Sequence, residues 1–291
     1  MSSNKTPVAP TLLPLDLADG SQTAVSIFTS NCATPNAPVI LIFPAMGVRA
    51  AYYYALAQAI ADKGYHVITA DLRGLGHSSV RASRHNDFGY YDILTFDLPA
   101  IVAAAQEHFV KHPIYLMGHS LGGHFSVLYA ALHSHSKQLN GLIFVAAGYP
   151  YYKSWGKRRA PLMWLTTQGF YALSKIIGYF PGKFIGFGGR EARTLMRDWS
   201  YLARTGNFKL TNSEHDFEAL ITTIELPVLS ISLEGDNFAP PAAVEGFNAK
   251  FKKAALTHLH LIPKTGENFN HFSWVKKNTA VVDSIVNWML K

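Results

Sequence analysis

The stretch Gly118-His119-Ser120-Leu121-Gly122 places a serine between two glycines, each two residues away. An apolar run precedes this serine and a helix-forming run follows it. That context is typical of a nucleophile elbow, in which a sharp strand-to-helix turn lifts the serine hydroxyl clear of the backbone. Small residues are needed at both flanking positions because the turn brings their Cα atoms against neighbouring chain. We therefore interpret Ser120 as a candidate nucleophile.

A serine hydroxyl is a good nucleophile only when a base takes its proton, and the base needs a third group that fixes its tautomer. His271 is the candidate base, because it follows the last predicted strand, whereas most of the other histidines fall on predicted strands or helices. Asp236 is the candidate acid, just beyond a predicted strand at 226–232. Glu234 is the alternative acid, but it lies nearer the end of that strand.

Acyl transfer also builds negative charge on the former carbonyl oxygen, and losing one backbone N–H aimed at that oxygen costs about 3–4 kcal/mol. We expect one donor at Leu121, directly after the nucleophile, and the other at Met46, in the loop after a predicted strand at 37–43. Ala45 and Gly47 leave the Met46 backbone room to face a ligand. The alternative is that this loop is an ordinary glycine-containing turn.

The elements that must position these residues alternate along the chain. A hairpin is predicted first, around an Asp-Gly turn at 18–20. Continuous apolar runs then predict buried parallel strands, and the stretches between them predict helices. The predicted strands are 37–43, 65–70, 113–120, 139–147, 226–232 and 256–262, and the predicted helices are 50–63, 91–109, 121–134, 241–252 and 273–290. The sequence thus predicts an α/β fold with a mostly parallel sheet flanked by helices.

Residues 148–215 interrupt the alternation with an aromatic, glycine-rich and basic segment, in which 161–177 and 190–204 are predicted helices. Such an insertion between core strands predicts a helical cap over the carboxyl edge of the sheet, where open α/β sheets bind ligands. The chain would then consist of a core in two parts, 1–147 and 216–291, and the cap. We expect the inner face of the cap to line an acyl pocket with Trp164, Phe170 and Tyr171.

The charge distribution is uneven. The net charge of the 291 residues is +7, but residues 151–209 hold eleven Lys and Arg against two acidic residues, a local charge of +9. Because this charge is confined to a segment dense in aromatics, we do not expect nucleic acid binding. An anionic substrate, an anionic membrane surface and a merely solvated helical face remain open interpretations.

The single cysteine, Cys32, excludes an intramolecular disulfide, which fits a reducing compartment. The first twenty residues lack the basic and apolar regions of a signal peptide, and no stretch reaches 18 uninterrupted apolar residues. These features favour a cytoplasmic protein.

Two motifs give the sequence a family resemblance over nearly its whole length, from about residue 11. The stretch GHSLGG and the stretch ADLRGLGHSS at 70–79 resemble motifs of the α/β-hydrolase superfamily, in its serine-hydrolase branch of lipases, esterases and monoacylglycerol-lipase-like enzymes. The chain order Ser, Asp, His is also the order of that superfamily. The resemblance implies that Asp71 to Ser79 support the site rather than react.

The sequence departs from the family pattern in two places. Pro44-Ala45 replaces the usual His-Gly after the third strand, and Asn270 stands before His271 where a glycine is usual. A serine nucleophile also speaks against the epoxide-hydrolase and haloalkane-dehalogenase branches, which use aspartate.

The predicted activity is hydrolysis of a carboxylic ester or thioester through an acyl-serine intermediate. Alternatives are acyl transfer to an alcohol or amine, a catalytically silent binding protein, and a peptidase resembling the proline-specific aminopeptidases. We expect a small-molecule acyl ester or lipid-like substrate and no cofactor. No metal is expected either, since the pairs His133/His135 and His258/His260 lack a third ligand at suitable spacing. Acyl-chain length, leaving group and oligomeric state are left open.

Overall fold

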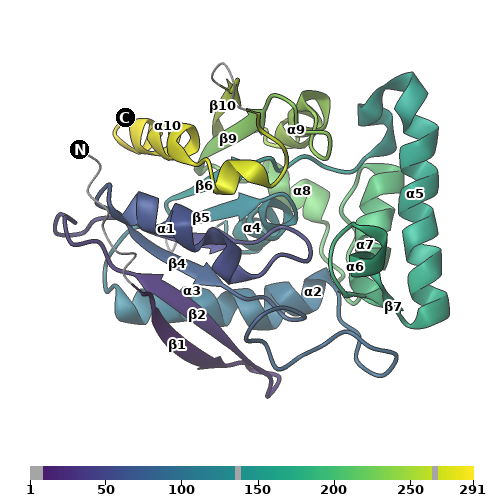
Figure 1. The fold of residues 1–291 in the computed structure, drawn as a ribbon, viewed down its shortest axis with the longest axis horizontal. Coiled ribbons are helices and arrows are strands. Elements are labelled where there is room, and N and C mark those ends of the chain that lie inside the picture. Colours follow the sequence, from purple (N-terminus) through teal and green to yellow (C-terminus); the bar gives the residue numbers. More distant parts are fainter. Residues whose placement is uncertain (1–8, 135–138, 264–267) are drawn as a thin grey trace.

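A sheet of eight strands forms the centre of the computed structural model, which describes residues 9–134, 139–263 and 268–291 (Figure 1). The strand order is β1-β2-β4-β3-β5-β6-β9-β10, and every pair is parallel except β1-β2 and β2-β4. The strands are β1 (Thr11–Asp16), β2 (Gln22–Phe28), β3 (Val39–Phe43), β4 (His66–Ala70), β5 (Ile114–His119), β6 (Gly141–Val145), β9 (Pro227–Leu233) and β10 (Ala255–Leu261). The predicted hairpin and the predicted α/β fold class are confirmed.

Helices cover both faces of this sheet, and β3 shows why its sequence is apolar throughout. Val39, Leu41 and Phe43 pack into one core cluster, whereas Ile40 and Ile42 pack into the cluster on the opposite face. All five side chains are at most 1% exposed, and burying each one contributes about 1.5–3 kcal/mol. The covering helices are α1 (Tyr54–Ala61), α2 (Tyr90–Asp92), α3 (Leu98–His108), α4 (Leu121–Leu132), α8 (Phe217–Thr222), α9 (Pro241–Asn248) and α10 (Thr279–Met289).

The last predicted helix begins six residues late, at Thr279 rather than at residue 273. Ser273–Val275 form a separate 3-10 helix, and before it the Asn270 side chain accepts hydrogen bonds from the backbone N–H groups of Phe272 (2.9 Å) and Ser273 (2.8 Å). A side chain that bonds the backbone N–H groups two and three residues on holds the chain in a turn. The loop around His271 is therefore fixed locally.

The segment 148–215 contains α5 (Gly156–Ile177), β7 (Tyr179–Phe180), α6 (Gly182–Ile185), β8 (Glu191–Ala192) and α7 (Arg193–Thr205). Helix α5 packs along α7, and Figure 1 shows both beside the sheet at one side of the molecule. The short antiparallel pair β7-β8 was not predicted, because two-residue strands leave no periodic pattern. The division of the chain into a core and a cap stays a prediction.

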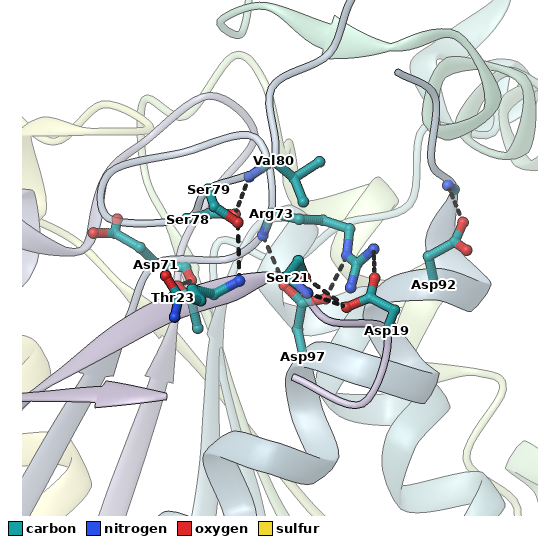
Figure 2. A network of polar contacts seen from close by, with 12 residues as sticks. Asp19, Ser21, Thr23, Asp71, Arg73, Ser78, Ser79, Val80, Asp92 and Asp97 are labelled. Atoms are coloured by element: carbon teal, nitrogen blue, oxygen red, sulfur yellow. Dashed lines mark hydrogen bonds and ion pairs between the residues drawn. The ribbon is translucent and has the colours of Figure 1, made fainter. Parts of the chain in front are cut away.

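The loop after β4 is held by buried acidic side chains (Figure 2). Asp71 accepts hydrogen bonds from the backbone N–H groups of Ala50 (2.8 Å) and His77 (3.1 Å). Figure 2 shows the Arg73 guanidinium between Asp97, which is fully buried, and Asp19, 3.0 Å away. This arrangement agrees with the supporting role that the family resemblance implies. Within the described residues, no helix is both long and apolar enough to cross a bilayer.

Candidate active site

Ser120 occupies the sharp turn between β5 and α4, with φ +53° and ψ −116°. Backbone of this kind is strained in a residue other than glycine, by about 1–3 kcal/mol. The flanking glycines are required by space. A Cβ on Gly118 would lie 2.2 Å from the Gly123 nitrogen, and a Cβ on Gly122 would lie 2.2 Å from the Phe43 oxygen. The strain and the close packing together present the Ser120 side chain at the end of the strand.

His271 and Asp236 form a buried pair, in which the His271 Nδ1 lies 2.8 Å from an Asp236 carboxylate oxygen. The other Asp236 oxygen accepts hydrogen bonds from the backbone N–H groups of Phe238 (2.8 Å) and Ala239 (3.0 Å). Both carboxylate oxygens are thus occupied. The pair fixes the imidazole with its proton on Nδ1 and leaves Nε2 able to accept a proton.

Glu234, the alternative acid, points elsewhere. Its carboxylate lies 3.0 Å from the Nε2 of His260 on β10, at the protein surface. The turn between the two acidic residues depends on Gly235, whose φ is +83° and whose absent Cβ would lie 2.9 Å from the Phe269 oxygen. This close approach brings Asp236, not Glu234, to the histidine loop.

The loop after β3 turns tightly around Met46, since Val48 donates to the Ala45 carbonyl at 3.1 Å and Gly47 has φ +73°. The backbone N–H of Ala45 is already bonded to the Tyr53 hydroxyl at 2.9 Å. Leu121 is the first residue of α4, so its N–H has no acceptor within the helix. The two residues predicted as donors line the same cavity as Ser120, and their role as an oxyanion hole stays a prediction.

Ser120, His271, Met46 and Leu121 all line one cavity of about 390 Å³. The remaining walls are mainly aromatic and apolar, and in the described part of the chain no Lys, Arg, Asp or Glu contributes to them. The large side chains in the lining are Trp155, Met163, Phe170, Ile185, Phe187, Trp199, Phe238 and Phe272. Such a concave apolar site with a few convergent polar groups is typical of a small-molecule pocket.

Comparison with known proteins agrees with this architecture. A family model described as the alpha/beta hydrolase fold matches residues 38–175. The chain has the α/β-hydrolase fold. The superfamily prediction made from the sequence is confirmed.

Several solved structures are similar to this α/β-hydrolase over nearly its whole length. Est1E from Butyrivibrio proteoclasticus, with ferulic acid bound, has a TM-score of 0.63 at 17% identity and covers 96% of this chain and 98% of its own. The thioesterase domain from the curacin biosynthetic pathway has a TM-score of 0.60 at 17% identity and covers 96% of this chain and 100% of its own. CarC, a serine hydrolase involved in carbazole degradation, has a TM-score of 0.59 at 14% identity and covers 97% of this chain and 99% of its own. No curated protein matches the chain. At these identities the structures establish the fold.

Of the three residues predicted to line an acyl pocket, Phe170 lines this cavity and the other two do not. Trp164 is 41% exposed, and Tyr171 borders separate hollows on the surface beside Arg197. The reason is helical geometry. The face of α5 toward the cavity carries Met163, Thr167 and Phe170 at intervals of three and four, and the residue after each is rotated by about 100°. Aromatic content alone therefore does not indicate which face of the helix lies toward the cavity.

Two lining residues that sequence reasoning missed are Phe238 and Phe272. Their ring centroids lie 5.4 Å and 5.0 Å from that of His271, and 6.2 Å from each other. Proximity in sequence was an available signal, because Phe238 follows Asp236 by two residues and Phe272 directly follows His271.

A loop of the 148–215 segment packs directly on the Met46 turn. A Cβ on Gly47 would lie 2.3 Å from the Gly189 nitrogen. The buried Glu191 carboxyl accepts a hydrogen bond from that Gly189 N–H at 2.7 Å. Burial raises the pKa of Glu191 to about 7, and the Gly189 hydrogen bond offsets this only in part. Glu191 is thus a buried acid at the contact between the two loops.

We expect Glu191→Gln to flatten the pH dependence of stability. The pKa of Glu191 is higher in the folded chain than the ordinary 4.5, so its stabilising contribution is complete below about pH 4.5 and is lost as pH rises through about 7. The difference amounts to about 3 kcal/mol in the free energy of unfolding. Urea unfolding from pH 4.5 to 8 measures it, with the exposed Glu225→Gln as the control. Parallel profiles for wild type and Glu191→Gln would contradict this expectation.

Proposed function

We propose that this α/β-hydrolase cleaves carboxylic esters or thioesters of uncharged, apolar acyl groups through an acyl-serine intermediate. The observation that carries the proposal is the buried pair of His271 and Asp236, which opens onto the same cavity as Ser120. A nucleophile, a base with a fixed tautomer and two backbone donors are the minimum set for this chemistry.

In the proposed first half-reaction, the Ser120 Oγ attacks the acyl carbon while the His271 Nε2 takes its proton. The resulting oxyanion accepts hydrogen bonds from the N–H groups of Met46 and Leu121, and Asp236 stabilises the imidazolium. The carbon–oxygen or carbon–sulfur bond then breaks, and His271 gives its proton to the leaving alcohol or thiol. The acyl group is now bonded to Ser120.

In the second half-reaction, a water molecule attacks the acyl carbon and His271 takes one of its protons. The bond to Ser120 breaks, His271 returns the proton to the Oγ, and the free carboxylic acid leaves. The net change is addition of one water across the ester or thioester bond. An alcohol or amine in place of this water would give acyl transfer.

The cavity supports an uncharged acyl group. Among the described residues, its walls hold Phe170, Phe187 and Trp199 and no Lys, Arg, Asp or Glu to pair with a carboxylate or an ammonium. A charge that leaves water without a partner costs several kcal/mol. The local charge of +9 at 151–209 lies outside this lining, so negative charge on a substrate would belong to the leaving group or to a lipid surface at the entrance.

A panel of esters tests the proposal. We expect turnover of 4-nitrophenyl esters of straight-chain acids, with free carboxylic acid as the product, and at least tenfold weaker turnover when the acyl group ends in a carboxylate. With one acyl chain held constant, kcat/KM for a 3-carboxy-4-nitrophenyl ester should fall with ionic strength, because charge attraction is screened over about 8–10 Å at physiological salt. The neutral 4-nitrophenyl ester should show little salt dependence.

The matched variant reverses Lys157, Arg158 and Arg159 to glutamate, all of which are exposed on the first turn of α5. It should flatten the salt dependence of the anionic ester and leave the neutral ester unchanged. Equal salt profiles for both esters in both proteins would mean that the positive charge at 151–209 contributes only to solubility. Acyl-ester product in place of free acid, formed with an added alcohol, would favour the transferase alternative.

A further inference from the structure

His119, directly before Ser120, is fully buried and touches two other loops of the site. Its Nδ1 lies 2.7 Å from the hydroxyl of Tyr53, and its Nε2 lies 3.4 Å from the Nε1 of Trp274. Its ring also packs against that of His271, with 4.9 Å between centroids. The hydrolytic steps described above do not use this histidine, and it does not line the cavity.

Hydrogen bonds on both sides of the His119 ring link the loop before Met46 to the backbone of His271. The Tyr53 oxygen accepts the backbone N–H of Ala45 at 2.9 Å, and the Tyr53 hydroxyl bonds the His119 Nδ1. On the other side of the ring, the His119 Nε2 accepts the Nε1–H of Trp274 at 3.4 Å. The same Nε1–H also bonds the His271 carbonyl, at 3.0 Å.

Burial keeps this arrangement neutral. It lowers the pKa of His119 well below its usual value, and the proximity of His271 adds to that effect, while the polar backbone of His271 opposes it. Burial likewise raises the pKa of Tyr53 far above its usual value. A polar group buried here without a hydrogen-bond partner would cost about 1–3 kcal/mol, and each of these groups has such a partner.

The chain of bonds joins three loops that meet at the reacting atoms. Ala45 adjoins Met46 in the oxyanion loop, His119 adjoins Ser120 in the elbow, and His271 is the base. Resting on the proposed function, we propose that Tyr53 and His119 are positioning residues. Their hydrogen bonds, continued by Trp274 to the His271 carbonyl, hold the oxyanion donor and the base at fixed places around Ser120. Errors of about 1 Å in such placement can cost about a hundredfold in rate.

Tyr53→Phe tests this role, because it retains the buried ring and removes only the hydroxyl. We expect kcat to fall tenfold to a hundredfold with KM unchanged, since the lost alignment matters in the transition state and not in substrate binding. The neighbouring Tyr54→Phe is the control. It removes a hydroxyl that bonds the Ser26 Oγ at 2.6 Å, away from all three loops, and should lower the melting temperature by a similar amount with kcat within twofold of wild type.

His119→Phe is the second variant, and it should reproduce the loss in kcat if both residues act through one chain of bonds. The double variant should then lose no more than the more affected single variant. Equal kcat for Tyr53→Phe and Tyr54→Phe in a wild type that hydrolyses esters would overturn the positioning role alone. A wild type that hydrolyses no ester would overturn the proposed function and this inference together.

Discussion

Replacing Ser120 by alanine is expected to abolish ester hydrolysis, with a fall in kcat of about 10⁵-fold to 10⁶-fold. The hydroxyl forms the covalent bond to the acyl group, and no other group of the cavity lining replaces it in the proposed mechanism. The melting temperature should stay within about 2 °C of wild type, because the turn depends on the space left by Gly118 and Gly122 rather than on the hydroxyl. Initial rates and a thermal melt on the same preparation measure both quantities.

Ser284→Ala is the matched control for that substitution. Ser284 lies on α10, its hydroxyl bonds the Ala280 carbonyl at 2.8 Å, and it does not line the cavity. It should retain wild-type turnover. Activity of Ser120→Ala within tenfold of wild type would remove Ser120 as the nucleophile.

Replacing Asp236 by asparagine should lower kcat by about 10⁴-fold with substrate binding largely retained. An asparagine can present its NH₂ group to the His271 Nδ1, which would move the ring proton to Nε2 and leave no base facing Ser120. The loss should therefore be seen in kcat, measured with saturating ester. KM reports whether the cavity itself is intact.

Glu234→Gln is the control for the acid and should change kcat by less than about threefold. The reason is geometric, since Glu234 pairs with His260 on β10 and not with His271. The opposite pattern, with Glu234→Gln inactive and Asp236→Asn active, would transfer the acid role to Glu234.

The core of the fold was predictable because its strands are buried on both faces. Runs such as 37–43 are continuously apolar, and the structure shows why, with alternate side chains of β3 entering different core clusters. The juxtaposition of Asp236 and His271 was predictable for a related reason. Each residue follows a strand of a parallel sheet, and the carboxyl ends of such strands meet at one edge.

Other features could not be read from the sequence because they depend on contacts between distant residues. The face of α5 toward the cavity is set by its packing on α7, so the sequence could not show that Phe170, and not Trp164 or Tyr171, lines this cavity. The polar chain through His119 joins residues 66 and 155 positions away along the sequence. The start of α10 was misplaced because the chain first forms a separate 3-10 helix at Ser273–Val275.

Labelling with a fluorophosphonate probe, followed by peptide mass spectrometry, is the most direct test of an acyl-serine mechanism. The probe reacts covalently with a serine only where a base and an oxyanion hole activate it. We expect a single adduct on Ser120 among the twenty serines of the chain, formed in parallel with the loss of ester hydrolysis. An adduct on another serine, or full hydrolysis in a protein that the probe does not modify, would contradict the account.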